Sequence, residues 1–289
     1  MLLQSKNKEF VKIGLNHQKL PQYDREIQDY IDRYLACQNN QFFSNRVHYS
    51  QIEPNLTIIR DDMLFGGTKS RYVIEVIHDH LKKHPTCKEI VSICQLYGSA
   101  QIALSWGIKI YNQLYDIQLQ AIIITDPYEG FLPYPAIAKN MGAKYYSVLD
   151  YEKMVNQYTK ERLDNILLSN VFEHPLVATN LFQLAKQILA EFDQFDEFWY
   201  TSGLGILMRA VENSGLAKVY YAIPVTGDAH IVKPVGQAIV VPHDQDFSEI
   251  AHELPPYSSA GHYDAKGWQY VWRRARDRPD LKILFWNVI

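Results

Sequence analysis

The sequence has few cysteines, no long apolar run and no large excess of charge of either sign. Its three cysteines, Cys37, Cys87 and Cys94, are odd in number and lack metal-motif spacing. We therefore expect reduced thiols in the cytoplasm rather than a disulfide framework. No apolar run approaches the length of a membrane span, and the charged N-terminal residues leave no room for a signal-peptide core. These absences favour a soluble protein.

Charge and histidine spacing also narrow the class of partner. The formal net charge is −3, which gives no reason to expect nucleic acid or an anionic membrane as the main partner. The basic run at 273–278 contains an acid and lies beside Pro279, so we interpret it as a solvated helix end rather than a nucleic-acid patch. No metal site is expected, because four histidines of the C-terminal half lack ligand spacing: His230, His243, His252 and His262.

Strand-like and helix-like patterns alternate along most of the chain. Strands are predicted at 56–59, 89–94, 120–125, 144–148, 197–200, 218–223, 237–241 and 282–286. Helices are predicted at 23–37, 72–83, 99–114, 135–141, 206–213 and 268–274, and 151–192 is predicted to be mostly helical with an interruption near Pro175. Such alternation is typical of parallel sheets covered by helices. The number of strands suggests two α/β lobes with a cleft between them.

Four segments have the residue types that chemistry requires. The first is Gly-Gly-Thr-Lys-Ser-Arg at 66–71, between a strand and an amphipathic helix. At the start of a helix, the helix dipole and burial both favour the neutral amine of a lysine over the charged ammonium form. A neutral amine can form a Schiff base. The two glycines would let the backbone approach a flat ligand. The alternative is a solvated lysine after an ordinary turn.

The second segment is the turn formed by Ser202, Gly203, Leu204 and Gly205, which follows a strand and precedes a helix. Such a turn exposes backbone N–H groups and is suited to phosphate, although many turns of this kind use glycine only for packing.

The third segment is 96–101, with Gly98, Ser99 and Gln101, where Ser99 either caps the following helix or contacts a ligand. The fourth is 261–267, where Asp264 would pair with a protonated ring nitrogen and Tyr263 would exchange a proton. The alternative for the fourth segment is a surface turn.

Together, in this order, these segments resemble fold type II pyridoxal-phosphate enzymes, the group of the tryptophan synthase β subunit. The aminocyclopropane-carboxylate deaminase and D-cysteine desulfhydrase branch is the most similar. Arg-Asp-Asp at 60–62 with Gly-Gly-Thr-Lys-Ser-Arg at 66–71 resembles its Arg-Glu/Asp-Asp and Gly-Gly-Asn-Lys-Leu-Arg pattern, and Tyr-Asp-Ala-Lys at 263–266 resembles its Tyr-Glu-Gly-Lys. The resemblance covers about residues 56–289.

The resemblance implies a two-lobed α/β architecture, each lobe a mostly parallel sheet flanked by helices, with pyridoxal 5′-phosphate in the cleft. It assigns 1–80 and 176–289 to a larger cofactor-binding domain, with 1–55 as a peripheral segment, and 81–175 to a smaller domain. It also implies a lyase or deaminase-like enzyme of a small amino acid and, by analogy, a homodimer.

Individual roles are carried over by the same resemblance. Lys69 would hold the cofactor as a Schiff base and act as the base or acid at the substrate α carbon. Ser202, Gly203, Leu204 and Gly205 would cradle its phosphate. Asp264 would keep its ring nitrogen protonated, and Tyr263 would face the substrate. Gly98, Ser99 and Gln101 would contact the substrate carboxylate and the face of the cofactor, with Ser99 also taking part in catalysis.

The sequence departs from the family pattern at two of these segments. Gly-Ser-Ala-Gln-Ile at 98–102 lacks the usual asparagine, and the phosphate turn lacks the usual run of glycines or threonines. Two other functions therefore stay open: a catalytically retired relative that binds a ligand or regulates, and an unrelated α/β protein with a phosphate ligand.

Overall fold

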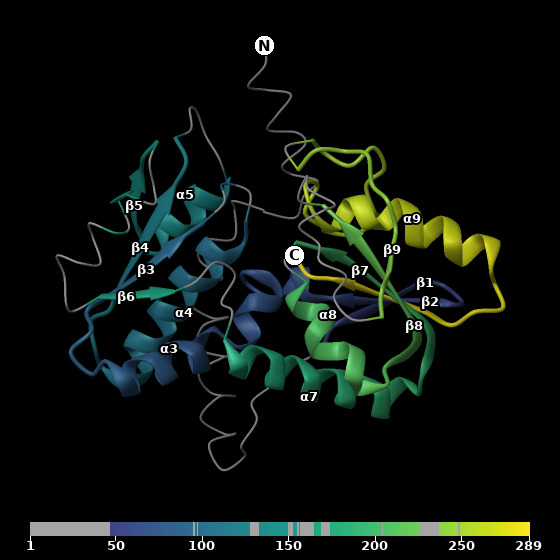
Figure 1. The fold of residues 1–289 in the computed structure, drawn as a ribbon, viewed down its shortest axis with the longest axis horizontal. Helices are drawn as coiled ribbons and strands as arrows, with labels where there is room; N and C mark the ends of the chain where they lie inside the picture. Colours follow the sequence, from purple (N-terminus) through teal and green to yellow (C-terminus); the bar gives the residue numbers. More distant parts are fainter. Residues whose placement is uncertain are drawn as a thin grey trace. The chain divides into compact units, whose positions relative to one another are not determined.

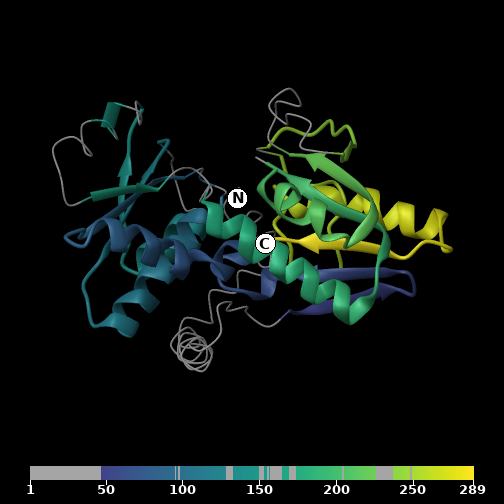
Figure 2. The same ribbon diagram turned by 60° about the horizontal axis from the view of Figure 1, so that its bottom comes forward.

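The computed structural model describes residues 47–94, 96, 98–127, 133–149, 153–154, 156, 165–168, 174–203, 205–225, 237–247 and 249–289. They form two compact units, each with its own sheet (Figures 1 and 2). Those of the first unit fall within Ser44–Leu64 and Val177–Ile289, and those of the second within Phe65–Leu176. Residues 65–80, which we assigned to the larger domain, thus fall in the second unit, and the predicted domain division stays a prediction. The helix predicted at 23–37 lies outside the described residues.

The sheet of the first unit has the order β1-β2-β10-β7-β8-β9 in the described part of the chain. Only the β1–β2 pair is antiparallel, and the remaining pairs described are parallel. The strand β1 was not predicted, because an edge strand with exposed positions does not show a buried apolar pattern. The strands are β1 (Tyr49–Glu53), β2 (Leu56–Arg60), β7 (Phe195–Ser202), β8 (Ala217–Pro224), β9 (Ile239–Val240) and β10 (Ile283–Asn287).

Helices cover both faces of this sheet. Figures 1 and 2 show α7 (Pro175–Phe192) and α8 (Ile206–Val211) on one side and α9 (Asp264–Asp277) on the other. On the α9 side, Trp268 packs with Phe285 in a buried apolar cluster. Because both faces are covered, β10 is buried at every position, and its residues 283–286 appear in the sequence as a continuous apolar run. A short helix, η5 (Glu212–Ser214), follows α8.

The sheet of the second unit has the order β5-β4-β3-β6, and all its described pairs are parallel. Its helix α4 packs against both α3 and α5. A Cβ at Gly107 of α4 would lie 2.7 Å from the Val73 side chain of α3, so glycine allows this close packing. The elements are α3 (Val73–Lys83), β3 (Glu89–Ile93), α4 (Ala100–Tyr115), β4 (Gln120–Thr125), α5 (Pro133–Asn140), β5 (Lys144–Ser147) and β6 (Asn165–Leu168).

The prediction of a mostly helical segment at 151–192 is wrong for β6, which pairs with β3 from Asn165 to Leu168. Its Asn-Ile-Leu-Leu sequence is a short apolar run, and such runs suit a buried helix and a buried strand equally well. The pairing with β3 decides between them. The alternating α/β architecture with mostly parallel sheets is confirmed.

Candidate active site

Lys69 lies in a short helical turn, η3 (Gly67–Arg71), that leads into α3. Its Nζ donates a hydrogen bond to Ser99 Oγ over 3.2 Å. Ser99 is the residue before α4, but its side chain makes no capping hydrogen bond. The structure therefore does not show the capping role that the sequence left open for Ser99, and its contact with a ligand stays a prediction.

The turn before Lys69 is shaped by packing on α4. Gly66 has φ +89°, and a Cβ there would lie 2.8 Å from the backbone of Ala103. Ser70 Oγ donates to the carbonyl oxygens of Phe65 and Gly67, both over 2.7 Å. The close approach that Gly66 permits is thus to a helix of the same unit, where we had expected a flat ligand.

Gln101 holds the segment that precedes α4. Its side chain is fully buried, and Nε2 donates to the carbonyl oxygens of Leu96 and Gly98 over 3.0 and 3.1 Å. Its Oε1 accepts a hydrogen bond from the Tyr145 hydroxyl on β5. Gly98, Ser99, Gln101 and Lys69 are thus neighbours in the second unit, while contact with a substrate stays a prediction. Tyr145 was not singled out, because its sequence signal is only that of a strand.

The predicted phosphate turn begins inside β7. Ser202 is the last residue of that strand, Gly205 has φ +70° before α8, and Leu204 lies outside the described residues. The backbone N–H of Gly203 donates to the Tyr263 hydroxyl over 2.8 Å. Two predicted site residues that are distant in the sequence therefore meet in the first unit.

Ser202 Oγ is buried and makes no hydrogen bond to any described group. Burial raises the pKa of the Tyr200 phenol, and the nearby Ser202 hydroxyl partly opposes that rise. The Ser202 and Tyr200 hydroxyls are nevertheless not in hydrogen-bond geometry. Since buried hydroxyls in proteins nearly always have a partner, a lone one needs an explanation.

Asp264 is the first residue of α9 and is fully buried. Its carboxyl oxygens accept hydrogen bonds from Thr201 Oγ1 and from the backbone N–H of Ile289, the latter over 2.8 Å. Burial raises the pKa of Asp264 to about 8, and these hydrogen bonds only partly oppose it. This burial favours the protonated form of the carboxyl group.

The segment around Asp264 is packed closely on the sheet. A Cβ at Gly267 would lie 2.7 Å from Thr201 Cγ2, so glycine lets α9 bring Asp264 to the end of β7. The helix predicted from residue 268 begins at Asp264 instead, and the reading of 261–267 as a surface turn is wrong. Burial also raises the pKa of Tyr263, as does the neighbouring Asp264.

Arg60 and Asp62 form a salt bridge in the first unit. Arg60 donates from Nε and Nη2 to the two Asp62 oxygens, each over 2.8 Å, and Asn287 Nδ2 donates to Asp62 over 2.7 Å. The Arg60 guanidinium also lies 4.5 Å from the Tyr257 ring centroid. Tyr257, which the sequence analysis missed, has a buried hydroxyl with no hydrogen-bond partner among the described residues.

The described residues contain no group of three or more His, Cys, Asp or Glu side chains placed to hold a metal ion. No helix in the described ranges combines the length and the apolar character that crossing a membrane requires.

No family model matches the sequence, and no curated protein matches it significantly. Solved structures do match its fold. An ACC deaminase homologue is 15% identical with a TM-score of 0.64, covering 89% of this chain and 94% of the other. A pyridoxal 5′-phosphate-dependent aspartate racemase is 12% identical with a TM-score of 0.59, covering 91% and 94%. The apo diaminopropionate ammonia lyase of Escherichia coli is 10% identical with a TM-score of 0.63, covering 90% and 87%.

These structural similarities span most of each chain, but the sequence identities are too low to assign a function to this chain. They agree with the two mostly parallel sheets and their covering helices. The chain has the α/β fold of fold type II pyridoxal-phosphate enzymes.

Proposed function

We propose that this chain binds pyridoxal 5′-phosphate on Lys69 and acts on a small amino acid or amino-acid derivative. The reaction is a deamination, an α,β-elimination or a β-replacement. The observation that carries the proposal is the contact between Lys69 Nζ and Ser99 Oγ in a chain of this fold. The similar structures support it, since they include a racemase named for its dependence on the cofactor and an ammonia lyase.

The residues of the first unit suit the two polar ends of the cofactor. A phosphate oxygen would give the buried Ser202 hydroxyl the acceptor that the described protein does not provide. A protonated pyridine nitrogen beside Asp264 would lower the pKa of its carboxyl group and form an ion pair with it. Ser202 would therefore suit the phosphate end of the cofactor, and Asp264 would suit its pyridine nitrogen.

The cofactor, when bound, would supply an electron sink for negative charge developing at the substrate α carbon. Lys69 Nζ would hold it and then move the α proton. Ser99 would orient Nζ through the hydrogen bond that the structure shows. Gln101 would keep the segment at Gly98 in shape beneath the substrate carboxylate.

The test is absorbance of the purified full chain with pyridoxal phosphate, followed by borohydride reduction and peptide mass analysis. The wild type is expected to gain a visible band and a reduced adduct on Lys69, and Lys69→Ala to show neither. Lys83→Ala, an exposed lysine of α3, is the matched control and is expected to behave as wild type. An adduct spread over several surface lysines, or none, would refute the assignment. A screen with amino acids then identifies the substrate by release of ammonia or a keto acid.

A second candidate is a binding or regulatory protein that keeps the fold. It is favoured by Gln101, whose amide is engaged by the protein itself at both ends. This protein would form the adduct on Lys69 without releasing a product from any amino acid. The third candidate, an unrelated phosphate-ligand protein, would form no adduct. A homodimer and a cytoplasmic location are further parts of the proposal.

A further inference from the structure

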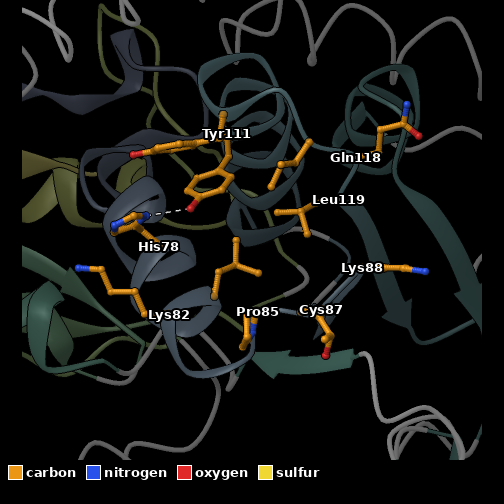
Figure 3. A pocket seen from close by; sticks show the side chains of 12 residues that line it. His78, Lys82, Pro85, Cys87, Lys88, Tyr111, Gln118 and Leu119 are labelled. Carbon is orange, nitrogen blue, oxygen red and sulfur yellow. Dashed lines mark hydrogen bonds between the residues drawn. The ribbon is translucent and has the colours of Figure 1, made fainter.

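A pocket of about 960 Å³ lies in the second unit, between the C-terminal halves of α3 and α4 (Figure 3). This volume is within the range of small-molecule sites, about 300–1,000 Å³. Ser99 precedes α4, whereas the pocket residue Tyr111 is 12 positions further along the chain. At about 1.5 Å per residue of helix, the two lie roughly 18 Å apart along α4. The pocket is therefore separate from the Lys69–Ser99 contact.

Three aromatic rings in mutual contact form one wall of the pocket, with His78 stacked on Tyr115 and Tyr111 tilted against both. The His78 and Tyr115 rings are 5.6 Å apart and nearly parallel at 18°, and Tyr111 lies 4.3 Å from Tyr115. His78 Nδ1 and the Tyr111 hydroxyl are hydrogen-bonded over 2.8 Å, as Figure 3 shows. Burial and the charge of Lys82 lower the pKa of His78, so its ring is neutral at neutral pH. The wall is a fixed, uncharged surface on which a flat ring can stack.

Apolar surface is accessible beside this wall. The Tyr115 side chain is 39% exposed and Ile117 is 37% exposed, which places both among the exposed large apolar residues of the described chain. Leu119 also lines the pocket. A ligand with an apolar body would cover this surface and gain the free energy of removing it from water.

The charged groups that line the pocket are cationic. Lys82 comes from α3 and Lys88 immediately precedes β3, and Figure 3 shows them on opposite flanks of the apolar centre. No aspartate or glutamate is among the residues that line it. Asp79, on the same helix as Lys82, is bound by Lys83 over 2.7 Å and by His174 over 3.0 Å. The pocket thus combines an aromatic wall with positive charge at its edge.

We propose that this pocket binds a small planar aromatic carboxylate. The ring stacks on the wall of His78, Tyr111 and Tyr115, and the carboxylate faces Lys82 or Lys88. The site is independent of the one proposed at Lys69, because none of its lining residues belongs to that site.

The test uses the full chain and 1-naphthoate as the probe, with binding measured by calorimetry and by ligand-observed NMR. The wild type is expected to bind the probe saturably. The double variant that combines Lys82→Gln and Lys88→Gln is expected to bind it at least five-fold more weakly. Lys83→Gln is the matched control, because it removes the same charge from the neighbouring position outside the lining. It is expected to bind as wild type does. The uncharged 1-naphthamide is expected to bind at least five-fold more weakly than 1-naphthoate.

Two further variants separate the outcomes. Tyr115→Ser shortens the aromatic wall at a partly exposed position and is expected to weaken 1-naphthoate binding at least five-fold. Lys69→Ala is expected to bind 1-naphthoate with wild-type affinity even though it loses the cofactor adduct. A failure of the pocket proposal can therefore be distinguished from a failure of the proposed function at Lys69. Equal affinity in wild type and the double lysine variant, or no saturable binding at millimolar probe, would overturn the inference.

Discussion

Lys69 Nζ and Ser99 Oγ lie 3.2 Å apart although 30 positions separate the two residues in the sequence. The lysine comes from the turn before α3, and the serine from the residue before α4. Since α3 and α4 pack against each other, their N-terminal ends bring these side chains together. The contact gives Ser99 a role that can be separated experimentally from that of Lys69.

Ser99→Ala is expected to retain the cofactor adduct on Lys69 but to lower kcat/KM. The variant loses one hydrogen bond worth about 0.5–1.5 kcal/mol, so the expected reduction is about two- to ten-fold. Steady-state kinetics and borohydride trapping measure the two effects on the same samples. Loss of the adduct together with activity would instead give Ser99 a structural role.

Tyr145→Phe is expected to lower the free energy of unfolding by about 0.5–1.5 kcal/mol, because it removes one buried hydrogen bond, the one to Oε1 of Gln101. Urea unfolding measures the difference. Tyr115→Phe, at a partly exposed tyrosine, is the control and is expected to change stability by less than about 0.5 kcal/mol. If the two variants are equally stable, the Gln101–Tyr145 hydrogen bond does not brace the segment before α4.

Ser202→Ala is expected to keep or raise the free energy of unfolding of the cofactor-free protein while weakening pyridoxal-phosphate binding. The reason is that its buried hydroxyl has no partner among the described residues and costs desolvation free energy until a ligand pairs with it. Thermal unfolding and equilibrium titration measure these opposite effects.

Ser214→Ala is the matched control for this experiment. The Ser214 hydroxyl donates to Val211 O over 2.5 Å and accepts from Leu216 N–H over 3.2 Å. Its removal is expected to cost about 1 kcal/mol of stability and to leave cofactor binding unchanged. A loss of stability in Ser202→Ala as large as that in Ser214→Ala would contradict the proposed phosphate contact.

The stability of the cofactor-free protein is expected to fall as pH rises, in part through Asp264. Its pKa is raised by burial from 3.8 to about 8, so between these values the folded protein holds a proton that the unfolded chain has lost. One such group makes the free energy of unfolding fall by at most about 1.4 kcal/mol per pH unit. The buried Glu75, whose pKa is raised to about 7, acts in the same direction.

The contribution of Asp264 is isolated by comparing wild type with Asp264→Asn. The variant is expected to lose stability less steeply over this pH range in urea titrations. Pyridoxal phosphate is expected to flatten the wild-type dependence, because a pyridinium nitrogen would lower the carboxyl pKa. Parallel curves for wild type and variant would show that Asp264 does not titrate in this range.

Much of the second unit could be predicted from local pattern. The strand β4 has the predicted bounds, α3 begins one residue later than predicted, and α4 differs from the predicted helix by one residue at each end. These elements are continuous apolar or amphipathic runs, so their periodicity is clear in the sequence. The short β6 and the edge strand β1 have no such signal, and pairing with a neighbouring strand alone defined them.

The sequence by itself determined the alternation of strands and helices and placed a lysine after a glycine turn, because both are properties of neighbouring residues. Tertiary structure decided the rest. It brought Ser99 to Lys69, directed Gln101 toward its own backbone and Tyr145, and raised the pKa of Asp264. Hydrogen-bond partners and burial depend on groups distant in the sequence, so they exist only after the helices have packed on their sheets.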